Sequence, residues 1–141
     1  MKLKVVLSVL LLSTLMVVDA YPFAANDAIS EQREVPVYTN DVPFDILTTG
    51  EDDGYRSAIP PIPFLVFMDE SNRSIELDFI KPVGEVEIVI SHNGTVVYSS
   101  SENILSSFAQ KFIQLSSDLA GDCFIEIKAV NGAYAYGSFG L

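Results

Sequence analysis

Two Asn-Gly pairs, each set between short apolar segments, constrain this chain more than any other feature. The first pair, Asn93-Gly94, lies in the stretch SHNGTVVY, and the second is Asn131-Gly132. A two-residue turn of type I′ needs a positive φ at both central positions, and Asn-Gly tolerates this backbone best. Each pair therefore predicts a hairpin between two antiparallel strands, and Asn93-Gly94 is assigned to type I′.

The segments around these turns alternate between apolar and polar residues, as half-buried strands do. Ile75, Leu77 and Phe79 fall on one face of residues 74–80, for example, and the residues between them are polar. A loop is expected at residues 102–107. The chain from residue 64 onward holds seven predicted strands: residues 64–68, 74–80, 85–91, 95–100, 108–115, 123–130 and 133–139.

Short strands at regular spacing, with no helical segment of useful length, predict an all-β fold. We assign residues 61–141 to an immunoglobulin-like antiparallel β-sandwich of about seven strands. Residues 21–60 show no sustained period, so we expect a flexible acidic leader with one short strand near residues 35–38. If residues 29–38 cover an edge of the sandwich, that edge is blocked; if they are free, they are available to a partner.

Residues 1–20 have the pattern of a secretory signal peptide. Two lysines precede an apolar run over residues 5–18, and Ala20 fits the small-residue cleavage position. The run is shorter than the about 20 apolar residues of a membrane-spanning helix. We therefore expect cleavage after Ala20, with a second possible site after Ala24 or Ala25, and export to the periplasm, the cell surface or the medium; an uncleaved anchor is the alternative.

The chain is strongly acidic, with 8 Lys and Arg against 19 Asp and Glu and a formal net charge of −11. Removal of Lys2, Lys4 and Asp19 with the signal peptide leaves 6 against 18, or −12. Such a surface repels phosphate backbones and anionic lipid headgroups. We therefore expect neither nucleic acid nor an anionic membrane as a partner.

Three motifs in this order resemble those of a known family. They are RSAIPPIP at residues 56–63, VEIVISHNGTVVY at residues 86–98 and IQLSSDLAGD at residues 113–122. The family consists of small secreted proteins of unknown function from gut Bacteroidetes. The resemblance implies one immunoglobulin- or fibronectin-like sandwich behind a signal peptide, and it carries no known catalytic residues.

The last two motifs are also similar to the C-terminal sorting domains of type IX secretion cargo. Two features depart from these patterns. Cys123 stands where the family usually has an aromatic residue, and the chain ends in AYGSFGL without the basic strand of the sorting domains.

Few residues offer nucleophilic or metal chemistry. The single histidine, His92, lies beside a tight turn and is expected to be solvated, while the phase of Cys123 predicts a buried core residue. A catalytic triad needs a nucleophile, a base and an orienting group, and a zinc site needs clustered Cys or His. With one His and one Cys, the sequence predicts neither kind of site. The single cysteine also leaves no internal disulfide.

Carboxylates remain as candidates for catalysis. Glu76 and Asp78 share the outer face of one predicted strand, and Glu85 and Glu87 share that of another. Same-face neighbours lie about 7 Å apart, a separation found in glycosidase acid pairs. Such chemistry needs a cleft that an exposed sheet does not offer, so a solvated acidic face is the preferred interpretation.

The acidic loops offer oxygen ligands of the kind that Ca²⁺ takes. Glu51-Asp52-Asp53 and Asp69-Glu70 are the two acidic runs, and neither has the spacing of an EF-hand. We therefore assign no metal site.

Other residues suit surface recognition. Asn72 and Asn93 each head an N-glycosylation triplet. Tyr134 and Tyr136 alternate on the last strand near Phe139, and such aromatics suit a binding surface or a sheet edge. Half-buried packing is the preferred interpretation of the tyrosines.

The sequence thus predicts an exported, non-enzymatic β-sandwich that binds a protein or glycan through a sheet face or loops. A sorting or envelope-docking domain related to type IX secretion is one alternative, and a carboxylate-based hydrolase is another. No catalytic, cofactor-binding or metal-binding residue is assigned. The ligand, the oligomeric state and the choice between release and retention at the surface stay open.

Overall fold

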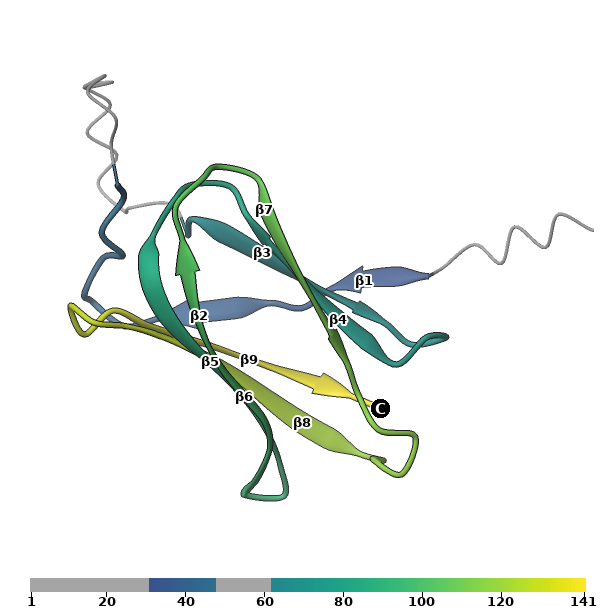
Figure 1. Ribbon diagram of the computed structural model, residues 1–141. Helices are drawn as coiled ribbons and strands as arrows, with labels where there is room; N and C mark the ends of the chain where they lie inside the picture. Colours follow the sequence, from purple (N-terminus) through teal and green to yellow (C-terminus); the bar gives the residue numbers. More distant parts are fainter. Residues whose placement is uncertain (1–30, 48–61) are drawn as a thin grey trace, which may run out of the picture.

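Every regular element that the structure describes is a β-strand. The computed structural model describes residues 31–47 and 62–141, and the strands form two antiparallel sheets packed face to face (Figure 1). The predicted all-β sandwich is therefore confirmed. The predicted signal peptide and the acidic run at residues 51–53 lie outside the described residues.

One sheet has four strands in the order β1-β3-β4-β7, and the other has five in the order β2-β9-β8-β5-β6. The strands from β3 to β9 are the seven predicted ones, and their ends differ from the prediction by at most one residue except at the end of β6. The bounds are β1 (Gln32–Glu34), β2 (Val37–Thr39), β3 (Phe64–Asp69), β4 (Ser74–Phe79), β5 (Gly84–His92), β6 (Thr95–Ile104), β7 (Ala109–Gln114), β8 (Asp122–Ala129) and β9 (Tyr134–Gly140).

The loop predicted at residues 102–107 is wrong at its start, because β6 continues to Ile104. The sequence SSSEN in this half of β6 is polar at every position and therefore shows no apolar alternation. Pairing of Glu85 with Asn103 and of Glu87 with Ser101 extends the strand nonetheless.

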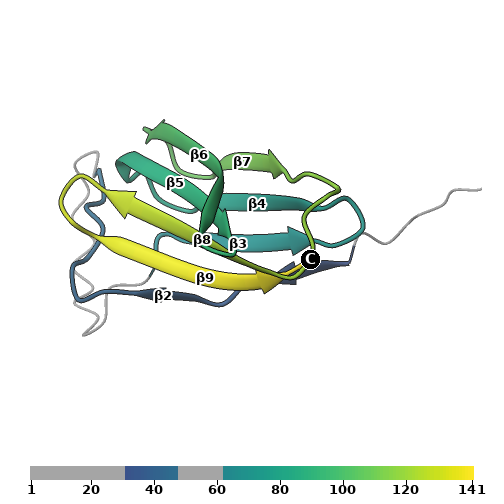
Figure 2. The ribbon, with the colours of Figure 1, turned by 90° about the horizontal axis from the view of Figure 1, so that it is seen from below.

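The N-terminal part of the sandwich comes from the region predicted as a leader. β1 pairs with β3 in the four-stranded sheet, and β2 pairs with β9 in the five-stranded sheet. Val35, between them, is only 2% exposed. Residues 32–39, which we call the arm, thus belong to the sandwich, and the one short strand expected near residues 35–38 is observed as two. Figure 2 shows β2 at the edge of the molecule opposite β6 and β7.

The core lies between the sheets and is built from the inward positions of the alternating strands. Burial of these side chains is the main stabilising contribution to such a fold. The largest fully buried side chains are Phe64, Phe79, Met68, Ile75, Leu77, Ile88, Ile90, Ile113, Ile125, Ile127, Val66 and Cys123. None of them comes from β6, whose only buried residue is Ile104.

The two Asn-Gly hairpins have different turns. Asn93 and Gly94 have φ of 51° and 78°, which confirms the type I′ turn. In the second hairpin Gly132 alone has a positive φ, of 89°, and its N–H donates to Ala129 O at 3.1 Å. The second hairpin is confirmed, but its turn needs the left-handed conformation only at the glycine.

Candidate functional site

Three tyrosines line up on the outer face of the five-stranded sheet. Tyr134 and Tyr136 project from β9, and Tyr38 of the arm lies opposite Tyr136 in the strand register. The ring centroids lie 5.8 Å apart for Tyr38 and Tyr136 and 5.7 Å apart for Tyr136 and Tyr134. We call this row the tyrosine ladder; its members Tyr38 and Tyr136 are 60% and 40% exposed.

Polar contacts hold one end of the tyrosine ladder. The Tyr134 hydroxyl donates to Glu126 Oε1 at 2.7 Å. Burial, reinforced by this hydrogen bond, raises the pKa of Tyr134 to about 12. Asn40, one residue after β2, accepts the Tyr134 N–H at 3.0 Å and donates to Gly132 O at 3.0 Å. The arm is therefore fixed to the hairpin that carries the ladder.

More side chains extend this face beyond the tyrosines. Phe124 of β8 is 48% exposed on the same side of the sheet. Lys128 of β8 lies opposite Glu87 of β5 on one side and opposite Tyr134 of β9 on the other. The face thus presents aromatic surface beside charges of both signs.

The aromatic residues singled out in the sequence divide between the surface and the core. Tyr134 and Tyr136 point outward, but Phe139 is only 4% exposed and belongs to the core, so it does not join them. Sequence reasoning missed Tyr38, because only the pairing of β2 with β9 brings it to the ladder.

A shallow hollow of about 440 Å³ lies on the same sheet, toward β6. Glu85 and Glu87 of β5 point outward into it, as the sequence predicted for both carboxylates. The other side chains that line its outer rim are those of Ser101, Asn103, Lys128 and Val130. Two carboxylates and one amine make the hollow acidic.

The carboxylates on the four-stranded sheet are bound by amides. Gln110 Nε2 donates to Glu76 Oε1 at 3.0 Å and to Asp78 Oδ1 at 3.1 Å. Gln32 Nε2 donates to the other oxygen of Glu76 at 2.6 Å. An amide thus bridges the two carboxylates, whereas a hydrolase would need room there for a sugar and a water.

The histidine and the cysteine are brought together, since His92 and Cys123 lie opposite each other in the strand register. His92 is hydrogen-bonded rather than freely solvated: its Nε2 donates to Ala120 O at 2.7 Å. Cys123 is fully buried as predicted, and burial raises the pKa of its thiol. A nucleophilic cysteine needs a lowered pKa, so the pair is arranged for packing.

The acidic loop residues are engaged in local contacts. Asp69 is 6% exposed and accepts hydrogen bonds from the backbone and side-chain amides of Asn72 at 2.9 and 2.7 Å. Glu70 forms an ion pair with Arg33 at 3.2 Å. Within residues 31–47 and 62–141, no three His, Cys, Asp or Glu side chains are grouped so that they could hold a metal ion.

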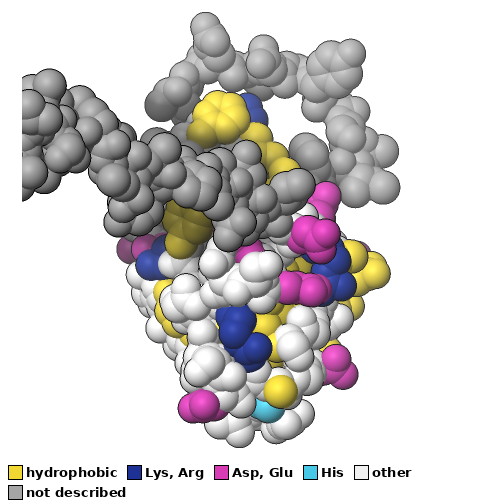
Figure 3. Space-filling model, turned by 90° about the vertical axis from the view of Figure 1, so that its right-hand side faces the viewer, with side chains coloured by type: hydrophobic (Ala, Val, Ile, Leu, Met, Phe, Trp, Pro, Cys, Tyr) yellow, Lys and Arg dark blue, Asp and Glu magenta, His cyan; other side chains and the backbone are white. Residues whose placement is uncertain are grey.

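Figure 3 looks onto the end of the sandwich that holds the β3–β4 turn and the C-terminus. On this face the Lys and Arg side chains are scattered among acidic and apolar ones, so they form no continuous basic patch of the kind that binds nucleic acid. Within the described ranges, no helix is long and apolar enough to cross a bilayer.

Comparison with known proteins gives a fold and no activity. No protein-family model matches the chain, and no curated protein matches it. A solved structure from Bacteroides vulgatus ATCC 8482, a DUF3244 family protein with an immunoglobulin-like β-sandwich fold, is similar at 20% identity and a TM-score of 0.56. The match covers 78% of this chain and 98% of that one. It confirms the immunoglobulin-like fold, and it adds nothing to the resemblance to type IX sorting domains.

Proposed function

We propose that the chain is an exported, non-enzymatic immunoglobulin-like module, related to the DUF3244 proteins, that binds a protein or glycan through the tyrosine ladder. Export rests on the signal-peptide pattern of residues 1–20. The relationship rests on the sequence motifs and on the similar fold of the Bacteroides protein.

The observation that carries the proposal is the alignment of Tyr38, Tyr136 and Tyr134 on an exposed sheet face. Tyrosine combines a large apolar ring with a polar tip, and it is enriched at binding interfaces. A ring held by its neighbours loses little conformational entropy when a ligand covers it. The contacts among the three rings, with the hydroxyl of Tyr134 held by Glu126, provide such a preformed surface.

The surroundings of the side chains that could act in catalysis support a non-enzymatic role. The Cys123 thiol has a raised pKa, and His92 is bonded to a backbone carbonyl. The carboxylates of Glu76 and Asp78 are bridged by an amide, and those of Glu85 and Glu87 line a hollow that is shallow. A rigid exposed sheet with such groups suits recognition better than catalysis.

The test is to screen the chain from residue 21 onward on a glycan array and against immobilised envelope proteins of the producing organism. Tyr136→Ala is the test variant. Phe112→Ala is the matched control, because Phe112 is 62% exposed on the outer face of the other sheet. We expect a ligand that Tyr136→Ala binds at least about tenfold more weakly and that Phe112→Ala binds normally, with thermal unfolding confirming that both variants fold.

Equal binding by Tyr136→Ala, or loss of binding only in Phe112→Ala, would contradict the assignment of the tyrosine ladder. The absence of any glycan or protein ligand would contradict the binding role itself.

A further inference from the structure

β6 is the longest strand of the sandwich and lies at the edge of a sheet. Among the strands of residues 31–47 and 62–141, its ten residues, Thr95–Ile104, pair with β5 alone. The opposite edge of the same sheet is the three-residue β2. A long edge strand presents a row of free backbone N–H and C=O groups to which another strand can bond.

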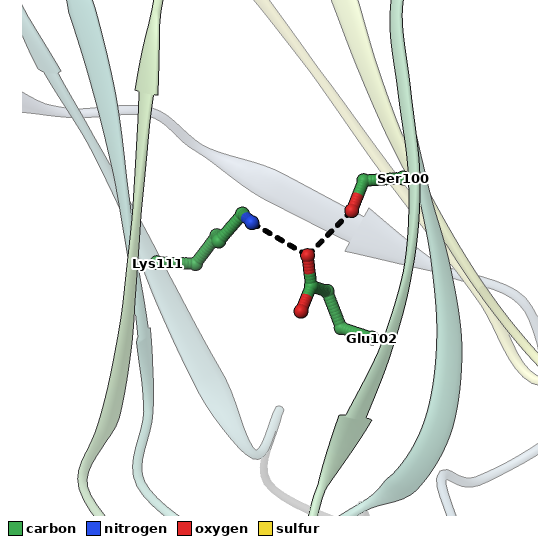
Figure 4. Close-up of polar contacts among 3 residues, drawn as sticks. All are labelled: Ser100, Glu102 and Lys111. Carbon is green, nitrogen blue, oxygen red and sulfur yellow. Dashed lines mark hydrogen bonds and ion pairs between the residues drawn. The ribbon is translucent and has the colours of Figure 1, made fainter.

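The usual protections of an edge strand are weak along β6. Its sequence TVVYSSSENI has no proline and no Lys or Arg. Its one charged side chain, Glu102, points inward, which is one such protection, but Lys111 neutralises this charge in an ion pair at 2.6 Å, as Figure 4 shows. The β-bulge lies beside Ile90 and Ser91, near the hairpin, so residues 98–104 keep a regular register.

The acidic hollow lies next to this edge and selects the chemistry of an added strand. The carboxylates of Glu85 and Glu87 belong to β5, the neighbour of β6. An added strand would lie about 10 Å from β5, two strand spacings away, and its outward Lys or Arg side chains would extend over β6 toward these carboxylates. A second copy of this acidic chain would instead bring like charge to the hollow.

We propose that the free edge of β6 accepts an extended segment of another protein, with Lys or Arg at alternate positions, as a sixth strand of the five-stranded sheet. Backbone hydrogen bonds to β6 supply affinity, and the hollow of Glu85 and Glu87 supplies the preference for basic side chains. This site is separate from the tyrosine ladder, which lies on β2 and β9.

The probes are two synthetic peptides as long as β6, one alternating Lys and Thr and the other alternating Glu and Thr. We expect the Lys-Thr peptide to protect the backbone amides of residues 98–104 from hydrogen exchange in NMR spectra. The Glu-Thr peptide should bind at least about tenfold more weakly, because each charge contact near a surface contributes up to about 1 kcal/mol. Tyr136→Ala should bind the Lys-Thr peptide normally, which separates this proposal from the previous one.

Two sets of variants test the acidic hollow and the backbone hydrogen bonds of β6 separately. Glu85→Gln combined with Glu87→Gln should weaken binding of the Lys-Thr peptide about fivefold, whereas Glu34→Gln, an exposed carboxylate on β1, should leave it unchanged. Adjacent residues of a strand direct their N–H groups to opposite sides. Proline removes the backbone N–H, so one of the variants Ser99→Pro and Ser100→Pro loses a hydrogen bond to β5 and the other loses an N–H at the free edge. The variant that loses the free-edge N–H should be the more stable of the two, and it should no longer bind the peptide.

The proposal is overturned if the Lys-Thr peptide gives no protection at millimolar concentration, or protects β7 or β2 instead. Equal binding of the two peptides also overturns it, because the hollow would then select nothing. Protection of residues 98–104 in concentrated protein without peptide would show a second copy as the occupant and would overturn the choice of a basic partner.

Discussion

The two sides of the sandwich are closed in different ways. On one side the arm crosses from the four-stranded to the five-stranded sheet and buries Val35, whose N–H donates to Val66 O at 2.8 Å. On the other side the middle of the inner face of β6 is polar: Glu102 forms an ion pair with Lys111 of β7 across the gap between the sheets and accepts the hydroxyl of Ser100 on its own strand (Figure 4). One closure is apolar and follows the backbone, whereas the other adds pairwise polar contacts to the buried side chain of Ile104.

This difference separates what the fold requires from what it leaves free. Apolar burial contributes more to stability than a partly exposed ion pair, so the arm side should dominate stability. The arm also supplies Tyr38 to the tyrosine ladder, so that side holds a rigid aromatic face. On the β6 side, no strand among the described residues pairs with the outer edge of β6.

The largest effect is expected where the arm touches β9. A Cβ on Gly137 would lie 2.8 Å from Pro36 O and 3.1 Å from the Val35 side chain, so backbone would have to move. We expect Gly137→Ala to lower the free energy of unfolding by about 3 kcal/mol, measured by urea denaturation. Gly140→Ala on the same strand is the control, because its Cβ would meet nothing nearer than 4.0 Å; an equal loss in both variants would argue against the close approach.

A somewhat smaller effect is expected inside the arm. Val35→Ala removes two methyl groups from a site that is 2% exposed, and we expect a loss of about 2 kcal/mol in unfolding free energy. Val130→Ala changes a side chain that is 84% exposed and should stay within about 0.5 kcal/mol of the parent chain. If Val35→Ala were as stable as Val130→Ala, the arm would not close the sandwich.

On the β6 side, the largest effect is expected from the turn that begins the strand. Gly94 has a φ of 78°, and a Cβ there would meet no atom within 4 Å. The cost of Gly94→Val is therefore conformational, on the order of 1–2 kcal/mol, and thermal unfolding measures it. Unchanged thermal stability would contradict the type I′ turn.

Strands that follow a two-residue alternation could be predicted, and the pairing of the two short edge strands β1 and β2 could not. The alternation of Ile75, Leu77 and Phe79 predicts the strand at residues 74–80, and the pair Asn93-Gly94 predicts a hairpin turn. β1 and β2 have three residues each, too few to show a period, and their partners β3 and β9 lie far along the chain.

The candidate site shows the same division. The alternation of Tyr134 and Tyr136 on one strand marks them as same-face residues, and the structure places both outward. Tyr38 joins them only through the long-range pairing of β2, and Phe139 leaves them because its alternate phase directs it into the core. Local pattern gives the face of a residue, whereas tertiary pairing decides which faces meet.

The smallest effect is expected from the polar closure itself. Lys111 and Glu102 side chains are 31% and 26% exposed, so solvent screens their ion pair. We expect a double-mutant cycle with Lys111→Met and Glu102→Gln to give a coupling free energy of about 0.5–1 kcal/mol at neutral pH. A coupling as large as the loss in Val35→Ala would remove the contrast between the two sides.

The pH dependence of that coupling sharpens the contrast further. Hydrogen bonds from Lys111 and Ser100 lower the pKa of Glu102 below its ordinary 4.5, so its contribution is present above pH 4.5 and is lost as the pH falls through the lowered value. The hydrogen bond to Glu102 raises the pKa of Lys111 above its ordinary 10.5, so that contribution is present below pH 10.5 and is lost as the pH rises through the raised value. The coupling should form a plateau between these limits and shrink in high salt. The stability difference between Val35→Ala and the parent chain should show no such plateau, because no charge is involved; a coupling that persists in strong acid would mean that packing, and not charge, closes the β6 side.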